Sequence, residues 1–381
     1  SVPVRTISRS VELGLRLLGL WPGLSYATVN WNLCILSLLV AQYFLYSYAV
    51  LYFDVNNIVP LIDCLGLALA YTLLTLKLVN LRLKRRALHE MIDVIVEDWK
   101  EASATVPNMT VMLKKAELSS ICSNVLISLY AFGVILYVIG GYVIQLTQSN
   151  NVTREFPVRM LLPFDYSTSP IFELTLIVQF LHQLCLACFI CVLNGFLLTV
   201  VRISFSQEFN TLPSGVFDFK TTLRKLIDRH QRIINFSNNI NNLFSSMALL
   251  EFIWNTIVIC CVGLAIVDAV KMITKSLIFY IAVTLEAFIF CYSGEYLSAK
   301  VIYSSFNFDD IAYFKAIGDA VYESLWYNLK PRECQVLLLI LMRSQKHLTI
   351  TTGGLMDLSL EVFTSIMKTS ASYVSIFHAM Y

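Results

Sequence analysis

Long charge-free stretches constrain the fold of this sequence more than any other feature. No Asp, Glu, Lys or Arg occurs in residues 17–53, 118–153 or 174–201. Each stretch is longer than the roughly twenty apolar residues that a helix needs to cross a bilayer. Only 14% of the 381 residues are charged and 57% are hydrophobic, whereas about a quarter of the residues of a soluble domain are charged. The sequence therefore predicts a membrane protein.

Four weaker segments complete a set of seven predicted spans. Two of them contain one acidic residue each, Asp63 and Glu286, and the last has a polar face. The four segments are 58–76, 252–267, 276–293 and 351–381. The predicted fold class is an all-α membrane protein with seven transmembrane helices.

The basic residues choose an orientation for these spans. If the N-terminus is cytoplasmic, 22 of the 28 Lys and Arg residues fall in cytoplasmic segments and four fall outside, while Lys77 and Lys368 lie within spans. Cytoplasmic loops of membrane proteins carry the excess of basic residues. The first apolar run is also too long for a cleavable signal peptide. We therefore expect a cytoplasmic N-terminus and an outside C-terminus.

The cytoplasmic segments carry amphipathic patterns of their own. Apolar residues recur at helical spacing in 81–99, 219–244 and 311–325, with acidic and basic residues on the opposite faces. Helices that lie in the membrane interface are an alternative, but their polar faces are usually uniformly basic. The pattern favours helices that extend into the cytosol and bury one another in a compact membrane-proximal domain.

The final segment combines apolar residues with a polar face. Its polar residues are Asp357, Ser359, Glu361, Ser365, Lys368, Thr369, Ser372 and Ser375. Polar groups at bilayer depth are tolerated where they face protein or water. This face is therefore expected either to line a water-filled path or to pack against neighbouring helices.

The outer half of the predicted bundle is rich in aromatic residues. The loop 148–170 contains three prolines and apolar side chains of its own, so we expect it to pack down over the helices. Some aromatic residues belong to the interfacial belt of a membrane protein. The alternative is an apolar cavity that binds small uncharged ligands. Its candidate walls are Tyr71, Tyr137, Phe172, Phe180, Phe279 and Tyr280.

Several classes of function lack support in the sequence. The ten cysteines fall in spans or cytoplasmic segments, so no disulfide framework is expected. His182, Cys185, Cys188 and Cys191 recur every third residue, but one helix fans such side chains around its axis, and we interpret them as packing residues instead of metal ligands. No enzyme motif occurs, and a net charge of +2 gives nucleic-acid binding no support. We predict no enzyme activity, metal or other cofactor.

The C-terminal sixty residues or so resemble a known family. Ala320-Val-Tyr-Glu-Ser-Leu-Trp-Tyr-Asn, Gly353-Gly-Leu and Ser359-Leu-Glu-Val-Phe-Thr-Ser-Ile-Met-Lys are similar to the C-terminal signature of the insect odorant receptors. The rest of the chain is similar to that family in span count, orientation and segment lengths. The segment 202–247 lacks the long insertion of the shared co-receptor, so the chain resembles an odorant-tuning subunit.

The resemblance implies an odorant-gated, non-selective cation channel subunit. Such a subunit binds small volatile, mostly apolar ligands and works in a tetramer with co-receptor subunits, in the plasma membrane of olfactory sensory neuron dendrites. A gustatory-type ligand-gated channel is a close alternative. A seven-helix receptor coupled to a cytosolic transducer is a more distant one, because the predicted orientation is inverted and the sequence motifs of those receptors are missing.

The resemblance also implies a division of the chain and positions in a pore. Residues 1–293 would hold six spans with the outer ligand pocket, 294–352 the cytoplasmic anchor segment, and 353–381 the pore-lining last helix. Gly353 and Gly354 would permit the turn into that helix. The implied pore positions are Ser372, Ile376, Ala379 and Met380, with Ile376 at a narrow apolar gate.

Overall fold

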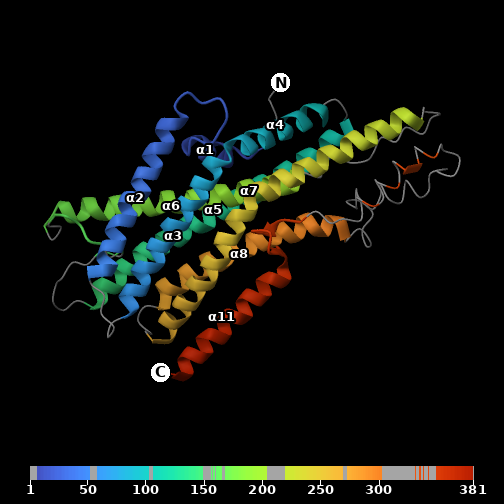
Figure 1. The fold of residues 1–381 in the computed structure, drawn as a ribbon. Helices are drawn as coiled ribbons and strands as arrows, with labels where there is room; N and C mark the ends of the chain where they lie inside the picture. The colour runs from blue at the N-terminus through green and yellow to red at the C-terminus, as the bar shows by residue number, and fades with distance from the viewer. Residues whose placement is uncertain are drawn as a thin grey trace.

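The computed structural model of this protein is almost entirely helical. It describes residues 7–51, 58–102, 106–148, 168–203, 219–268, 273–302 and 349–380, with scattered positions in 156–164 and 331–342. Its elements are α1 (Arg9–Leu17), α2 (Ala27–Leu51), α3 (Ile58–Leu83), α4 (Arg85–Ala102), α5 (Val106–Gln148), α6 (Ile171–Ile203), α7 (Phe219–Asp268), α8 (Ile273–Ile302), β1 (Thr351–Thr352), β2 (Met356–Asp357) and α11 (Leu360–Met380) (Figure 1).

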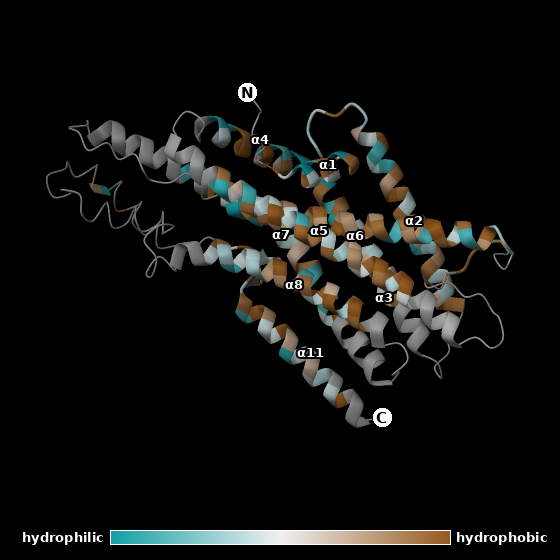
Figure 2. Cartoon of the chain, turned by 180° about the vertical axis from the view of Figure 1, so that it is seen from behind, coloured by the Kyte–Doolittle hydropathy of each residue, from teal (hydrophilic) through white to brown (hydrophobic). Residues whose placement is uncertain are grey.

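The predicted all-α membrane architecture is confirmed. Five described segments are long and apolar enough to cross a membrane, and they lie on α2, α3, α5, α6 and α8. The two other predicted spans fall on α7 and α11. Large apolar side chains on α2, among them Val29, Leu33 and Leu36, are exposed on the surface, where water would make their exposure costly. Figure 2 draws many positions along α2 and α6 in brown, the colour of hydrophobic residues.

The direction of the helices agrees with alternating spans. The C-terminal ends of α2, α7 and α11, which carry the first, fifth and seventh predicted spans, point to the same end of the molecule (lower left in Figure 1). Each span reverses the direction of the chain across the membrane, so all odd-numbered spans should run the same way. The arrangement is the one that the seven-span prediction requires.

Two helices extend well beyond a bilayer. At 1.5 Å per residue, the 50 residues of α7 measure about 75 Å, whereas the hydrocarbon core is about 30 Å thick. On α4, the side chains of Leu88, Ile92 and Ile95 are buried, as the amphipathic pattern predicts. The guanidinium of Arg232 on α7 lies 2.7 Å from the carboxylate of Glu97 on α4, which joins the two extensions. Most of the predicted anchor segment 294–352 lies outside the described residues.

A short hairpin precedes the last helix. Strands β1 and β2 pair antiparallel around Gly353 and Gly354, whose φ angles are 60° and 78°. Glycine adopts these positive angles without strain, and a Cβ on Gly353 would also meet Leu249 of α7 at 2.7 Å. The helix therefore begins at Leu360, later than the predicted boundary at residue 353.

Hydrogen bonds fix this hairpin and the start of α11. The backbone N–H of Thr351 donates to Asn241 Oδ1 at 2.8 Å, and that of Gly353 donates to the Ser245 carbonyl at 3.1 Å. Ser359 caps α11, because its hydroxyl oxygen accepts the N–H of Val362 at 3.2 Å. The entry to the last helix is thus held against the long helix α7.

The described part of the outer loop packs down, as predicted. Phe156 and Val158 are buried, and the Phe156 ring stacks on Phe172 with centroids 4.8 Å apart. The N–H of Leu161 donates to the Phe44 carbonyl on α2 at 3.2 Å. This loop therefore covers the outer end of the bundle between α2 and α6.

Candidate ligand cavity and pore helix

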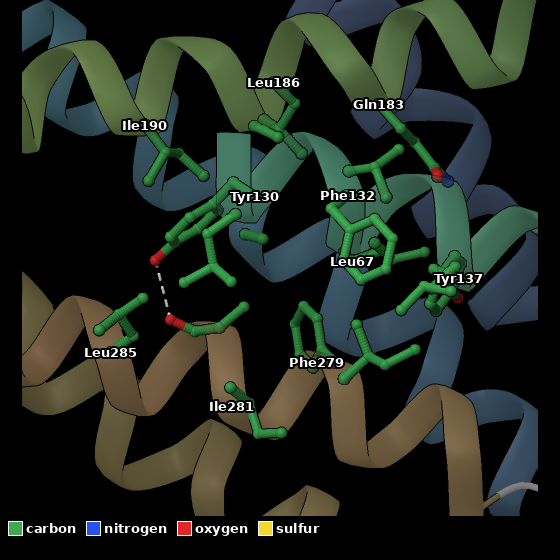
Figure 3. A pocket seen from close by; sticks show the side chains of 18 residues that line it. Leu67, Tyr130, Phe132, Tyr137, Gln183, Leu186, Ile190, Phe279, Ile281 and Leu285 are labelled. Carbon is green, nitrogen blue, oxygen red and sulfur yellow. Dashed lines mark hydrogen bonds between the residues drawn. The ribbon is translucent and has the colours of Figure 1, made fainter. Parts of the chain in front are cut away.

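A cavity of about 310 Å³ lies between helices of the bundle and opens to the surface, where its wall residues Leu129, Phe132 and Ile281 are about half exposed. Four helices form it: α3, α5, α6 and α8 (Figure 3). Its walls are aliphatic and aromatic, and they include Leu67, Leu129, Tyr130, Phe132, Tyr137, Gln183, Leu186, Ile190, Phe279, Ile281 and Leu285. This volume lies at the lower end of the range for small-molecule sites, about 300–1,000 Å³, and such sites are mainly apolar.

The cavity gathers some of the predicted ligand residues and leaves others out. Tyr137 of α5 and Phe279 of α8 line it. Phe172 stacks on the outer loop, Phe180 is half-buried elsewhere on α6, and Tyr280 packs in a second apolar cluster. Helical spacing shows which residues share a face of one helix, but it does not show which neighbouring helix that face contacts. The role of all six in ligand binding stays a prediction.

Tyr71 and His182 pair with each other and are not among the wall residues of the cavity. The Tyr71 hydroxyl and His182 Nδ1 are 2.8 Å apart, and the two rings stack with centroids 5.3 Å apart. His182 is therefore already hydrogen-bonded to a buried tyrosine. Within the described part of the chain, no group of three His, Cys, Asp or Glu side chains is placed to hold a metal ion.

Polar atoms reach the cavity wall at few positions. The Tyr130 hydroxyl donates to the Ala282 carbonyl at 2.9 Å, so its polar end is occupied (dashed line in Figure 3). Gln183 of α6 is the other buried polar side chain of note, with 7% of its surface exposed. Gln183 was not among the residues predicted to bind ligand. Three amides, Gln179, Gln183 and Asn194, lie within the charge-free stretch 174–201, and they were the available signal because polar residues inside a span are rare and often functional.

A buried charge cluster lies next to the cavity. Lys77 of α3 forms ion pairs with Glu251 of α7 and with Glu286 of α8, and its Nζ is 2.6 Å from Glu286 Oε1. Lys77 is only 2% exposed, and Asn255 donates to Glu251 at 3.0 Å. Glu286 directly follows the cavity residue Leu285. The cluster ties three helices together beside the cavity.

Helix α8 stands between the cavity and the last helix. Phe279 lines the cavity, and it also packs against the cluster of Val258, Val283 and Ile366, the last of which belongs to α11. Further along α8, the ring of Phe288 meets the ring of Phe363 on α11 edge to face, with centroids 5.6 Å apart. Directly packed side chains therefore connect the cavity wall with α11.

The polar face of α11 points away from the bundle. Glu361, Ser365, Lys368 and Ser372 are exposed, whereas Ile366 and Ser370 face α7 and α8. Several hydroxyls bond to carbonyls of the same helix, as Ser372 does to Lys368 at 2.9 Å.

The predicted pore positions lie at the end of this face. Ser372 is exposed, and Ile376, one turn later, is 55% exposed. Ala379 and Met380 belong to α11, but their side chains lie outside the described residues. A helix rises 5.4 Å per turn, so Ser372, Ile376 and Ala379 share one stripe. Their place in a pore stays a prediction.

The chain is similar to known proteins over most of its length. A family model described as the 7tm odorant receptor matches residues 57–371. Odorant receptor 82a of Drosophila melanogaster is 21% identical over 355 residues, which cover 88% of each protein. Odorant receptor 13a of the same fly is 21% identical and covers 100% of this chain and 97% of its own. The fold is similar to the solved structure of the insect olfactory receptor OR5 from Machilis hrabei in complex with eugenol, with a TM-score of 0.72, 14% identity and 97% of each chain covered.

Proposed function

This chain belongs to the 7tm odorant receptor family, and from that membership we propose that it is a subunit of an odorant-gated, non-selective cation channel. The family is one of receptors and not of enzymes, and its members serve olfaction. In this proposal the chain binds a small volatile molecule, binding opens a pore, and the chain assembles with other subunits.

The observation that carries the proposal is the position of the cavity relative to the last helix. An apolar space of about 310 Å³ suits a small volatile molecule. Phe279 is one of its wall residues, and it also packs against the cluster of Val258, Val283 and Ile366, where α11 contacts α7 and α8. An odorant that displaces Phe279 can shift the balance between two positions of α11, because packed interfaces tend to be bistable instead of continuously deformable.

The exposed polar face of α11 supports assembly with other subunits. A stripe that includes Lys368 and Ser372 cannot face lipid tails at low cost, so it needs water or protein beside it. Four such helices around an axis satisfy this need and enclose a conducting path. We propose a tetramer with co-receptor subunits in the plasma membrane of olfactory sensory neuron dendrites.

Current recordings test the ligand site. We expect cells that express this chain with its co-receptor to pass a cation current when volatile odorants are applied. Tyr137→Ala enlarges the cavity, so it should change the order of potency of the odorants, with shifts of about tenfold for those that fill the cavity best. Tyr43→Ala is the matched control, because Tyr43 is 68% exposed on α2, away from the cavity. Identical dose–response curves for wild type and Tyr137→Ala would place the ligand elsewhere.

Antibody staining tests the orientation. With 22 basic residues on one side and four on the other, an epitope before Ser1 should stay hidden in unpermeabilised cells, while one after Tyr381 should be stained. Both epitopes should be stained once the cells are permeabilised, which controls for expression. The reverse pattern in intact cells would contradict the channel proposal and favour a receptor coupled to a cytosolic transducer.

A further inference from the structure

One polar side chain in the cavity has no hydrogen-bond partner among the described residues. Gln183 is 93% buried, lines the cavity from α6, and forms no hydrogen bond with any described residue. In Figure 3 its amide points from α6 toward the side where Tyr137 lies. The other glutamine on this face of α6, Gln179, donates to the Val158 carbonyl of the outer loop at 3.4 Å. The two amides sit one turn apart in different surroundings.

The amide of Gln183 is open to the cavity, because its nitrogen and oxygen are not among the fully buried, unpartnered side-chain atoms of the described residues. A ligand that fills the cavity without a hydrogen-bonding group would shield this amide from water and leave it unpaired, which is unfavourable. Leucine, which is common in this span, would fill the same space without that cost. The amide offers two donors and one acceptor, so it can bond to a hydroxyl or to a carbonyl oxygen. A ligand group in the cavity is the partner that its position allows.

The size of the cavity limits the rest of the ligand. One water occupies roughly 30 Å³ in the liquid, so a cavity of about 310 Å³ has room for about ten non-hydrogen atoms. Leu67, Leu186, Ile190 and Ile281 surround that space with aliphatic groups. Nearly all of the ligand must therefore be hydrocarbon.

We infer that Gln183 is the residue that selects oxygen-bearing odorants: alcohols, ketones, aldehydes or esters of about ten non-hydrogen atoms with one hydrogen-bonding group. This inference rests on the proposed function and adds to it the chemical class of the odorant. The amide oxygen of Gln183 accepts a hydrogen bond from an alcohol hydroxyl, or its NH2 group donates one to a carbonyl oxygen, and the aliphatic walls contact the hydrocarbon chain. A hydrocarbon of equal size fills the cavity but leaves the amide unpaired.

Three probes of equal size test the inference: nonan-1-ol, nonan-2-one and decane. Currents are recorded from cells that express the full chain with its co-receptor, and the half-maximal concentration of each probe is measured. Wild type should respond to the alcohol and the ketone at concentrations at least about tenfold below decane. Gln183→Leu should raise the half-maximal concentrations of the two oxygenated probes by about tenfold, the effect of losing one buried hydrogen bond, and leave decane unchanged or more potent.

Gln179→Leu is the matched control. It makes the same substitution one turn away, outside the cavity, and should keep the preference for the oxygenated probes. Equal shifts for all three probes in Gln183→Leu, or no shift, would overturn the inference. The inference would also be overturned if wild type responds to decane at lower concentrations than to the oxygenated probes. The same holds if none of the three probes evokes a current while other volatiles do. If no volatile in a broad panel evokes a current, although the protein is normally expressed at the cell surface, the proposed function would instead be overturned.

Discussion

Replacing Lys77 by methionine is expected to prevent most of the protein from reaching the cell surface in folded form. The substitution keeps the length of the side chain but removes the ammonium that lies between Glu251 and Glu286. Two carboxylates then stay buried side by side without a counter-charge. Removing one partner of a buried ion pair costs about 3–5 kcal/mol, a large share of the 5–15 kcal/mol that stabilises a typical protein.

The amount of folded protein measures this effect. Detergent-solubilised receptor should give a much smaller monodisperse peak in size-exclusion chromatography for Lys77→Met than for wild type. Adding Glu251→Gln and Glu286→Gln removes the stranded charges and should restore most of that peak. Arg86→Met is a matched control on the exposed pair with Glu90, which should contribute almost nothing. A normal peak for Lys77→Met, or no recovery in the triple variant, would show that the cluster does not hold the helices together.

A polar residue at Ile376 should let ions pass without odorant. Ile376 is exposed near the end of the polar stripe of α11, where facing subunits would complete an apolar ring. An apolar constriction closes by expelling water, and a hydroxyl in the ring keeps it wet. We expect Ile376→Ser, made together with the equivalent change in the co-receptor, to raise the resting current severalfold. Ile376→Val keeps the ring apolar and should stay closed at rest.

Cysteine substitution gives an independent measure of the same position. A cysteine at Ile376 should react with small water-borne thiol reagents, faster after odorant is added, and the current should change. A cysteine at Ile366 is the matched control, because Ile366 lies on the same helix but is buried against α7 and α8. An unchanged resting current in Ile376→Ser, with no reagent effect at Ile376→Cys, would mean that this helix does not line the pore as proposed.

The sequence predicted what depends on short-range pattern. The charge-free stretches located the long helices, and the amphipathic pattern located α4, because both signals repeat along a single helix. The two glycines before the last helix predicted a turn, and both have positive φ. These features need no knowledge of which helices become neighbours.

The remaining features depend on contacts between distant residues. Lys77 and Glu286 are 209 positions apart, so nothing local indicates that they form a pair. The hairpin delays the start of α11 because Asn241 and Ser245 of α7 bind it, which the sequence of the hairpin does not reveal. Aromatic density found the region of the cavity but not its walls, since only two of the six predicted residues, Tyr137 and Phe279, face it. Each case requires knowing the side of a helix that a neighbour covers.

If odorant binds in the cavity and α11 lines the pore, as proposed, the position of α8 between the two couples odorant sensitivity to resting activity. If odorant favours the open pore by some factor, an open pore favours odorant by the same factor, because linkage between two sites is reciprocal. A substitution where α11 packs against α7 and α8 that makes the pore easier to open thus lowers the threshold concentration of every agonist at once. Lineages of such receptors can therefore gain or lose sensitivity as a whole while their order of preferred odorants stays fixed by the cavity.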